Sequence, residues 1–178
     1  MLAVNPRLLV IVGGTEYSGN LTGVADDPVR LRVPDRVVYA PHDYRWFNSD
    51  AELADYGAFQ SKLEQRWGYI LSEGRSYTAP LYLSEFGTCT NPSPREQCHP
   101  LDPTYLRFIT RFLRETDMEW AYWPLNGTQS AGYGRDHGAV EAYGLLNTDW
   151  SAYGNRPVLA ALRSVQRARL GREAPTLR

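Results

Sequence analysis

The feature that most restricts the fold of this chain is an alternation of short apolar runs with segments of helical periodicity. Four apolar runs predict strands at residues 7–12, 36–40, 80–84 and 119–125. The first two are continuously apolar, which is typical of strands buried on both faces. Apolar residues at steps of three and four predict helices at residues 50–70, 102–116 and 157–170. This order predicts an α/β fold with a parallel sheet.

The length of the chain limits the size of that sheet. With 178 residues the chain suits a single domain, which we place at residues 1–178. A complete (β/α)8 barrel needs about 200 residues or more, so this chain is too short to form one. Four parallel strands could form a small doubly wound sheet or one half of a barrel.

The composition excludes several classes of function. The formal net charge is −1, so the chain lacks the strongly basic character of nucleic-acid-binding proteins. No run approaches the roughly 18 apolar residues of a membrane span, and the chain does not open with an export signal. Aromatic residues make up 12% of the chain. That fraction indicates either an aromatic core or aromatic surfaces that meet a polar ligand.

The two cysteines, Cys89 and Cys98, lie nine positions apart. A zinc site would need further ligands at suitable spacing, and neither His99 nor the other two histidines complete such a set. We therefore expect no metal and no cofactor. A disulfide that closes a small loop is favoured over two free thiols, and it would indicate an oxidising compartment.

Polar and aromatic residues gather where the predicted strands end, which is where parallel α/β proteins bind their ligands. These residues are His42, Tyr44 and Trp46 after the second strand, Glu85 at the end of the third, and Trp123 in the fourth. A carboxylate such as Glu85 is costly to bury unless it is paired. It could serve as a glycosidase nucleophile, or it could be an ion-paired or helix-capping loop residue. His42 and Tyr44 lie two apart and so share one side of an extended segment.

Six segments carry a resemblance to a known family, in the family's order. They are residues 5–12 (NPRLLVIV), 21–31 (LTGVADDPVRL), 37–44 (VVYAPHDY), 81–88 (LYLSEFGT), 120–123 (WAYW) and 144–150 (GLLNTDW). Together they resemble glycoside hydrolase family 5, the cellulase family of (β/α)8 barrels. The resemblance implies a half TIM barrel in which the four parallel strands are strands five to eight.

The resemblance also implies a function, namely retaining hydrolysis of β-linked glucans of the endoglucanase or cellulase type. Glu85 becomes the nucleophile, and His42 and Tyr44 become the pair that lines the cleft. The residues expected to bind the sugar are Trp123, Trp46 and Tyr17. The family and the cysteine pair together imply a secreted protein.

The chain departs from the family pattern at the general acid/base. The family places this Glu in an Asn-Glu-Pro motif at strand four, and that motif does not occur in this sequence. A retaining mechanism needs two carboxyl groups about 5 Å apart. Glu16, just past the first strand, is a candidate substitute acid, and Glu141 is a weaker one.

Two alternatives to an active enzyme therefore remain open. One is a catalytically impaired half-barrel that keeps its aromatic sugar contacts, and the other is a truncated fragment. In a half-barrel the outer strands, residues 7–12 and 119–125, lack neighbours, and the inner face loses its opposite wall. We expect Leu9, Ile11, Val38 and Leu81 on that inner face. The chain should therefore form a homo-oligomer, either a dimer that closes the barrel or a domain swap.

Overall fold

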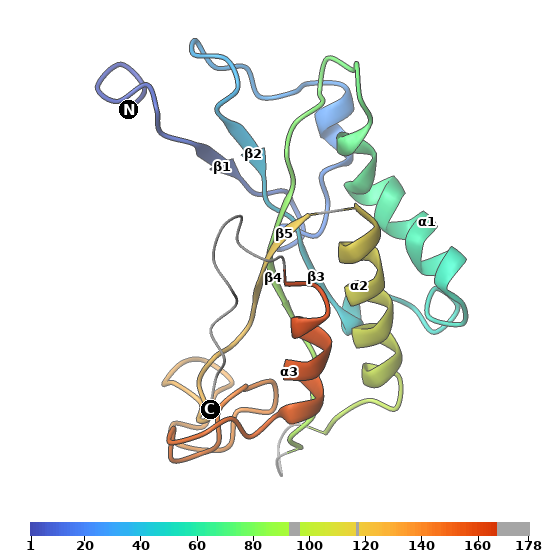
Figure 1. The fold of residues 1–178 in the computed structure, drawn as a ribbon, viewed down its shortest axis with the longest axis vertical. Coiled ribbons are helices and arrows are strands. Elements are labelled where there is room, and N and C mark those ends of the chain that lie inside the picture. Colours follow the sequence, from blue (N-terminus) through green and yellow to red (C-terminus); the bar gives the residue numbers. More distant parts are fainter. Residues whose placement is uncertain (93–96, 117, 167–178) are drawn as a thin grey trace.

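The computed structural model describes residues 1–92, 97–116 and 118–166 (Figure 1). The strands are β1 (Val10–Val12), β2 (Val37–Tyr39), β3 (His42–Tyr44), β4 (Tyr82–Gly87) and β5 (Glu119–Tyr122). The α-helices are α1 (Tyr56–Arg66), α2 (Asp102–Thr116) and α3 (Arg156–Arg163). Three short 3-10 turns, η1 (Thr22–Ala25), η2 (Arg45–Phe47) and η3 (Gly68–Leu71), lie between them.

The ladders between the described strands are all parallel, as the sequence predicts, and antiparallel pairing occurs only as isolated bridges in described loops. One ladder joins β1 to β2, and a second joins β3, β4 and β5 in that order. A parallel bridge between Tyr39 and Leu81 connects the two ladders. The arrangement therefore contains four parallel chain segments in sequence order, which is consistent with half of a barrel.

The second of these segments is longer than the predicted strand at residues 36–40. It continues to Tyr44 but is divided into β2 and β3 around Pro41, which has no N–H to donate to a ladder. The Pro41 carbonyl still accepts a hydrogen bond from the Ser84 amide at 3.0 Å. The segment thus pairs with β1 up to Tyr39 and with the β4 segment from Tyr39 onwards, on both sides of the break.

The helices begin at residues that suit a helix N-terminus. The side chains of Asp55 and Asn155 accept hydrogen bonds from the amides of Ala58 and Val158, which caps α1 and α3. Helix α2 matches its predicted bounds, whereas the helix predicted at residues 50–70 is shorter, because turns precede α1 and η3 follows it. Helix α3 ends at Arg163, and the last four residues of the helix predicted at 157–170 lie outside the described part.

The core lies between the sheet and the helices, which all cover one side of the strands (Figure 1). Its largest fully buried side chains are aromatic: Trp67, Tyr39, Tyr105, Phe59, Phe86 and Phe112. A second group of aromatic residues is exposed, including Trp46 and Trp123. The aromatic content therefore serves both a core and a surface. No helix among the described residues is long and apolar enough to cross a membrane.

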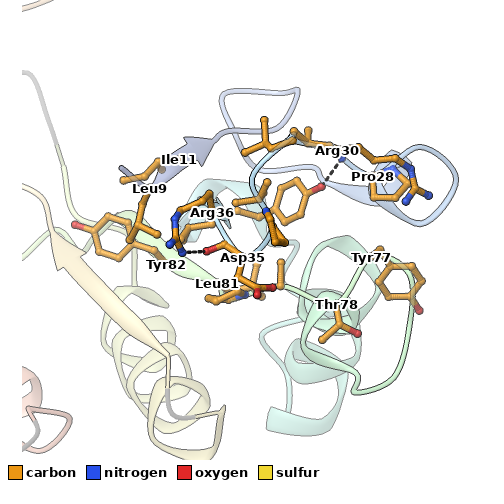
Figure 2. Close-up of a pocket in the computed structure, with 18 of the residues that line it drawn as sticks. Leu9, Ile11, Pro28, Arg30, Asp35, Arg36, Tyr77, Thr78, Leu81 and Tyr82 are labelled. Carbon is orange, nitrogen blue, oxygen red and sulfur yellow. Dashed lines mark hydrogen bonds between the residues drawn. The ribbon is translucent and has the colours of Figure 1, made fainter. Parts of the chain in front are cut away.

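The apolar residues of β1 and the segment before it are largely uncovered. Leu9 and Ile11 are 59% and 58% exposed, while Val12, the last residue of β1, packs against the core. Figure 2 shows Leu9 and Ile11 beside a groove of about 930 Å³ at the N-terminal ends of β2 and β4. Its wall includes Tyr82. Leu81 also borders the groove, but the expectation that it is uncovered is wrong, because it is 4% exposed and packs in the core. An apolar edge of this kind is normally covered by a partner.

Candidate functional site

The parallel register of β3 and β4 places three predicted site residues together. His42 lies opposite Glu85, and Tyr44 lies opposite Gly87. The Tyr44 hydroxyl donates a hydrogen bond of 2.7 Å to Glu85 Oε1. His42 Nδ1 lies 4.0 Å from the same oxygen. The Glu85 and His42 side chains are 32% and 27% exposed, so the group borders solvent at the C-terminal ends of the strands.

The environment of Tyr44 keeps its phenol protonated. Burial is the largest cause that raises the pKa of Tyr44 far above its usual value, and the hydrogen bond to Glu85 adds to it. A protonated phenol donates, and a carboxylate accepts. Tyr44 therefore holds the Glu85 carboxylate in a fixed orientation as a neutral hydrogen-bond donor.

Aromatic rings extend from this pair towards solvent. The rings of Tyr44 and Trp46 stack with centroids 4.1 Å apart and an interplanar angle of 10°. Tyr143 packs edge-on against both, with centroids at 6.2 and 5.8 Å. Trp46 is 55% exposed, so one side of the stack is open to a ligand. Apolar sugar faces pack on such rings.

Trp123 directly follows β5, and a glycine brings it close to β4. The Trp123 amide donates to the Phe86 carbonyl at 2.8 Å. A Cβ on Gly87 would lie only 2.3 Å from the Trp123 carbonyl oxygen. The ends of β4 and β5 can therefore approach this closely only with glycine at position 87. Trp123 itself is 51% exposed.

Tyr17 and Glu16 lie in the loop after β1, with Tyr17 88% exposed. The Glu16 carboxylate accepts hydrogen bonds from Asn20 Nδ2 at 3.0 Å and from Arg66 at 2.6 Å. The Asn20 bond and then the Arg66 bond lower the pKa of Glu16. A general acid needs a raised pKa, so these partners work against the role predicted for Glu16.

Glu141, the weaker candidate acid, is almost fully buried in the loop after β5. It pairs with Arg135 and accepts a hydrogen bond from Asn126 Nδ2 at 3.4 Å. The isolated bridge between Thr128 and Val140 lies in the same loop. Glu141 is thus placed to hold this loop together.

The predicted disulfide is confirmed. Cys89 and Cys98 are bonded, with their Cα atoms 5.1 Å apart. The Asp102 carboxylate lies close to both sulfurs and accepts a hydrogen bond from the His99 amide at 2.6 Å. Because both sulfurs are in the disulfide, this group offers no thiolate to a metal. The disulfide ties the loop after β4 to the start of α2.

Two features of the site were not predicted from the sequence. Tyr143 joins the aromatic stack from a loop rich in Gly and Tyr, and only its place just before the 144–150 motif could have indicated it. Lys62 forms a buried ion pair with Asp43 behind β3. The sequence could have indicated this burial, because the only lysine of the chain lies one helical turn after the apolar Phe59.

A sequence profile described as Cellulase (glycosyl hydrolase family 5) matches residues 1–129. The chain belongs to glycosyl hydrolase family 5. The family 5 chain is 33% identical to an endoglucanase of Paenibacillus polymyxa, covering 88% of itself and 38% of that protein. It is 30% identical to a glycosyl hydrolase 5 family protein of Chamaecyparis obtusa, covering 91% of itself and 29% of that relative.

The fold of the family 5 chain also matches solved structures. An endocellulase variant from Pyrococcus horikoshii in complex with cellotetraose aligns with a TM-score of 0.67 and 22% identity. The alignment covers 92% of this chain and 45% of the endocellulase. The chain thus spans less than half the length of the solved structure and about a third of that of the curated relatives.

Proposed function

We propose that this chain carries the nucleophile half of a retaining β-glucan hydrolase, with Glu85 as the nucleophile. The observation that carries the proposal is the 2.7 Å hydrogen bond from Tyr44 to Glu85 at adjacent strand ends. The open Tyr44–Trp46 stack and the exposed Trp123 provide surfaces for sugar rings. Relatives named as endoglucanases favour a β-linked glucan as the substrate.

The chemistry follows from the position of Glu85. A carboxylate oxygen of Glu85 bonds to the anomeric carbon while the bond from that carbon to the glycosidic oxygen breaks. The leaving oxygen takes the electron pair and a proton. Water then attacks the same carbon, loses a proton to the group that protonated the leaving oxygen, and releases the Glu85 carboxylate. The two inversions retain the configuration. His42 Nδ1 lies 4.0 Å from Glu85 Oε1, beside the reacting carboxylate.

The proton donor for the leaving oxygen is the part of the mechanism with the least support. Asp43, the neighbour of His42 and Tyr44 in β3, is bound to Lys62 behind the strand. Glu16 and Glu141 are paired with arginines. We retain Glu16 as the candidate acid within the chain, since it is the more exposed of the two. A weak acid function would leave a half-barrel that binds glucan better than it cleaves it.

The test is to trap Glu85 with a 2-deoxy-2-fluoro-β-cellobioside that carries a dinitrophenolate leaving group. This leaving group needs little acid assistance, so the first step does not require the missing acid. We expect mass spectrometry to find the sugar esterified to Glu85 in the wild-type chain and not in Glu85→Gln. Cellotetraose binding without any trapping would favour the binding-module alternative.

We also propose that two copies of the chain associate through the open edges of the sheet. Among the described strands, β1 pairs only with β2 and β5 pairs only with β4. Because every pair is parallel, β1 of one copy and β5 of another can extend one sheet with a consistent direction. The exposed Leu9 and Ile11 would then be buried. The disulfide supports a further proposal, that the protein works in an oxidising, extracellular compartment.

A further inference from the structure

A buried polar cluster lies directly behind the strand that carries His42 and Tyr44. It consists of Asp43, Lys62 and Asn48, which are 1%, 7% and 2% exposed. Lys62 Nζ donates to Asp43 Oδ1 and to Asn48 Oδ1, both at 3.0 Å. Asn48 Nδ2 donates to Asp43 Oδ2 at 3.1 Å. Lys62 comes from α1, so the cluster joins the helix layer to β3.

The cluster also binds the backbone of β3. Asn48 Nδ2 donates to the Tyr44 carbonyl at 2.7 Å, and the Tyr105 hydroxyl donates to the Asp43 carbonyl at 2.7 Å. In the described ladders β3 pairs with β4 only and is the edge of its sheet. Tyr105 from α2 and Asn48, which follows η2, therefore hold two consecutive carbonyls of a strand that has a ladder on one side only.

The Asn48 amide is held at both ends, by the Lys62 ammonium at Oδ1 and by two acceptors of β3 at Nδ2. An amide has one acceptor end and one donor end. Because Lys62 donates to Asn48 Oδ1, the Nδ2 end is turned towards the Tyr44 carbonyl. Asp43 Oδ2 and the Tyr44 carbonyl both accept from Nδ2 and so exclude the flipped amide. Loss of the ammonium instead leaves Asn48 Oδ1 without its donor and the amide held at one end only. The cluster thus fixes the orientation of the Asn48 amide and also packs against β3.

We infer that Lys62 is a positioning residue for the reaction at Glu85, acting through Asn48 and the backbone of Tyr44. The inference rests on the proposed function, because it assigns Lys62 a part in setting the Tyr44–Glu85 contact. Asp43 points away from the site, since alternate residues of a strand face opposite sides. Lys62 therefore touches neither substrate nor Glu85, and its effect passes through β3.

The burial of the pair is consistent with a role other than stability. Burial raises the pKa of the Asp43 carboxyl, while Lys62 and Asn48 oppose that rise. Buried ion pairs are often no more stabilising than apolar residues of similar volume. The Lys62–Asp43 pair instead suits a positioning role. Its hydrogen bonds are directional, it lies behind β3, and the reaction requires a fixed geometry of Tyr44 and Glu85.

The central experiment compares Lys62→Met with Leu63→Ala, the next residue of α1, which is fully buried in the core. Both variants should lower the stability of the fold. In the folded fraction, Lys62→Met should slow the first-order trapping of Glu85 by the fluorinated cellobioside by about tenfold or more. The dissociation constant of the sugar should change little, and Leu63→Ala should leave the trapping step close to wild type.

A second variant separates positioning from stability. The double variant Asp43→Asn/Lys62→Met removes both buried charges and should recover stability relative to Lys62→Met. The Asn48 amide still lacks the ammonium, so trapping should stay slow. If trapping recovers together with stability, the cluster is merely structural and the inference is wrong.

A readout that needs no chemistry distinguishes this inference from the proposed function. Hydrogen exchange of the amides at residues 42–44 should be faster, relative to global unfolding, in Lys62→Met than in Leu63→Ala. If the wild-type chain is never trapped but this difference is observed, the proposed function fails and the positioning of β3 stands. Equal exchange in the two variants would overturn the positioning itself.

Discussion

At the scale of single residues, the site depends on a hydrogen bond from the Tyr44 phenol to the Glu85 carboxylate. Tyr44 holds Glu85 Oε1 at 2.7 Å, and His42 lies 4.0 Å from it. The sequence could predict that these three side chains meet, because all lie at the ends of predicted neighbouring strands. It could not predict Lys62, since one lysine on a helix is normally solvated and only tertiary packing shows its partner.

Tyr44→Phe should separate orientation from folding. The ring and its stack with Trp46 remain, but the hydrogen bond to Glu85 is lost. We expect trapping of Glu85 to slow by about tenfold to a hundredfold, with little change in the unfolding midpoint. The measurement is the rate of adduct formation by mass spectrometry. Trapping at the wild-type rate would show that the phenol does not orient the nucleophile.

The tyrosines also predict a loss of stability at alkaline pH. Burial raises the pKa values of Tyr44, Tyr105 and Tyr122 above their usual range in the folded state. The unfolded state therefore releases these protons first, near pH 10, and stability present below about pH 10 falls as the pH rises further. Urea midpoints measured between pH 8 and 11 should drop at the alkaline end. A flat profile would contradict the buried phenols.

At the scale of elements, the site is set by how closely the ends of β3, β4 and β5 approach one another. The periodicity of the sequence predicted the four parallel segments and the bounds of α2 correctly. It missed the division at Pro41, because apolar character alone does not show where a strand changes partner. It also overextended the first helix, whose predicted ends are occupied by turns and by η3.

Gly87→Ala tests the approach of β4 to β5. The added methyl group would meet the Trp123 carbonyl at 2.3 Å, so the strand ends must separate. We expect a loss of about 1–3 kcal/mol in the free energy of unfolding and weaker cellotetraose binding, because Trp123 is displaced. Gly23→Ala is the matched control, since a Cβ there meets nothing within 4 Å. Similar effects from both variants would rule out strand spacing as the cause.

The disulfide should stabilise the loop that links β4 to α2. Replacing Cys89 and Cys98 by serine should lower the free energy of unfolding by about 2–3 kcal/mol in the chain-entropy picture. Urea unfolding of the double variant beside the oxidised wild type measures the difference. Because the loop starts two residues after Gly87, we also expect weaker sugar binding in the variant. Identical midpoints would mean that the bond adds no stability.

At the scale of the whole molecule, the helices cover one side of the sheet and leave apolar residues of β1 open. The resemblance to half of a family 5 barrel predicted this, whereas the length alone also allowed a small doubly wound sheet. What covers the open side could not be read from the pattern, because a second copy and a different half-barrel would bury the same residues. We propose that a second copy of the chain covers it.

Light scattering tests that choice. We expect a mass of about twice the 20.2 kDa of the chain at micromolar concentration. Ile11→Asp should shift the protein to the monomer, because a carboxylate at the contact between copies would be buried without a partner. Val29→Asp, at a residue that is 40% exposed and lies outside the two edge strands, serves for comparison. A stable wild-type monomer would refute the dimer.

The two open edges of the sheet have one more consequence. Since β1 and β5 lie at opposite ends of a sheet whose strands all run the same way, copies can be added without reversing direction. A duplicated gene would encode two copies in tandem. The proposed pairing of β1 with β5 would then occur within one polypeptide instead of between two chains. The linker would then set an effective concentration, and assembly would no longer depend on dilution. If two copies associate as proposed, fusion of the two chains would be enough to form a single-chain barrel.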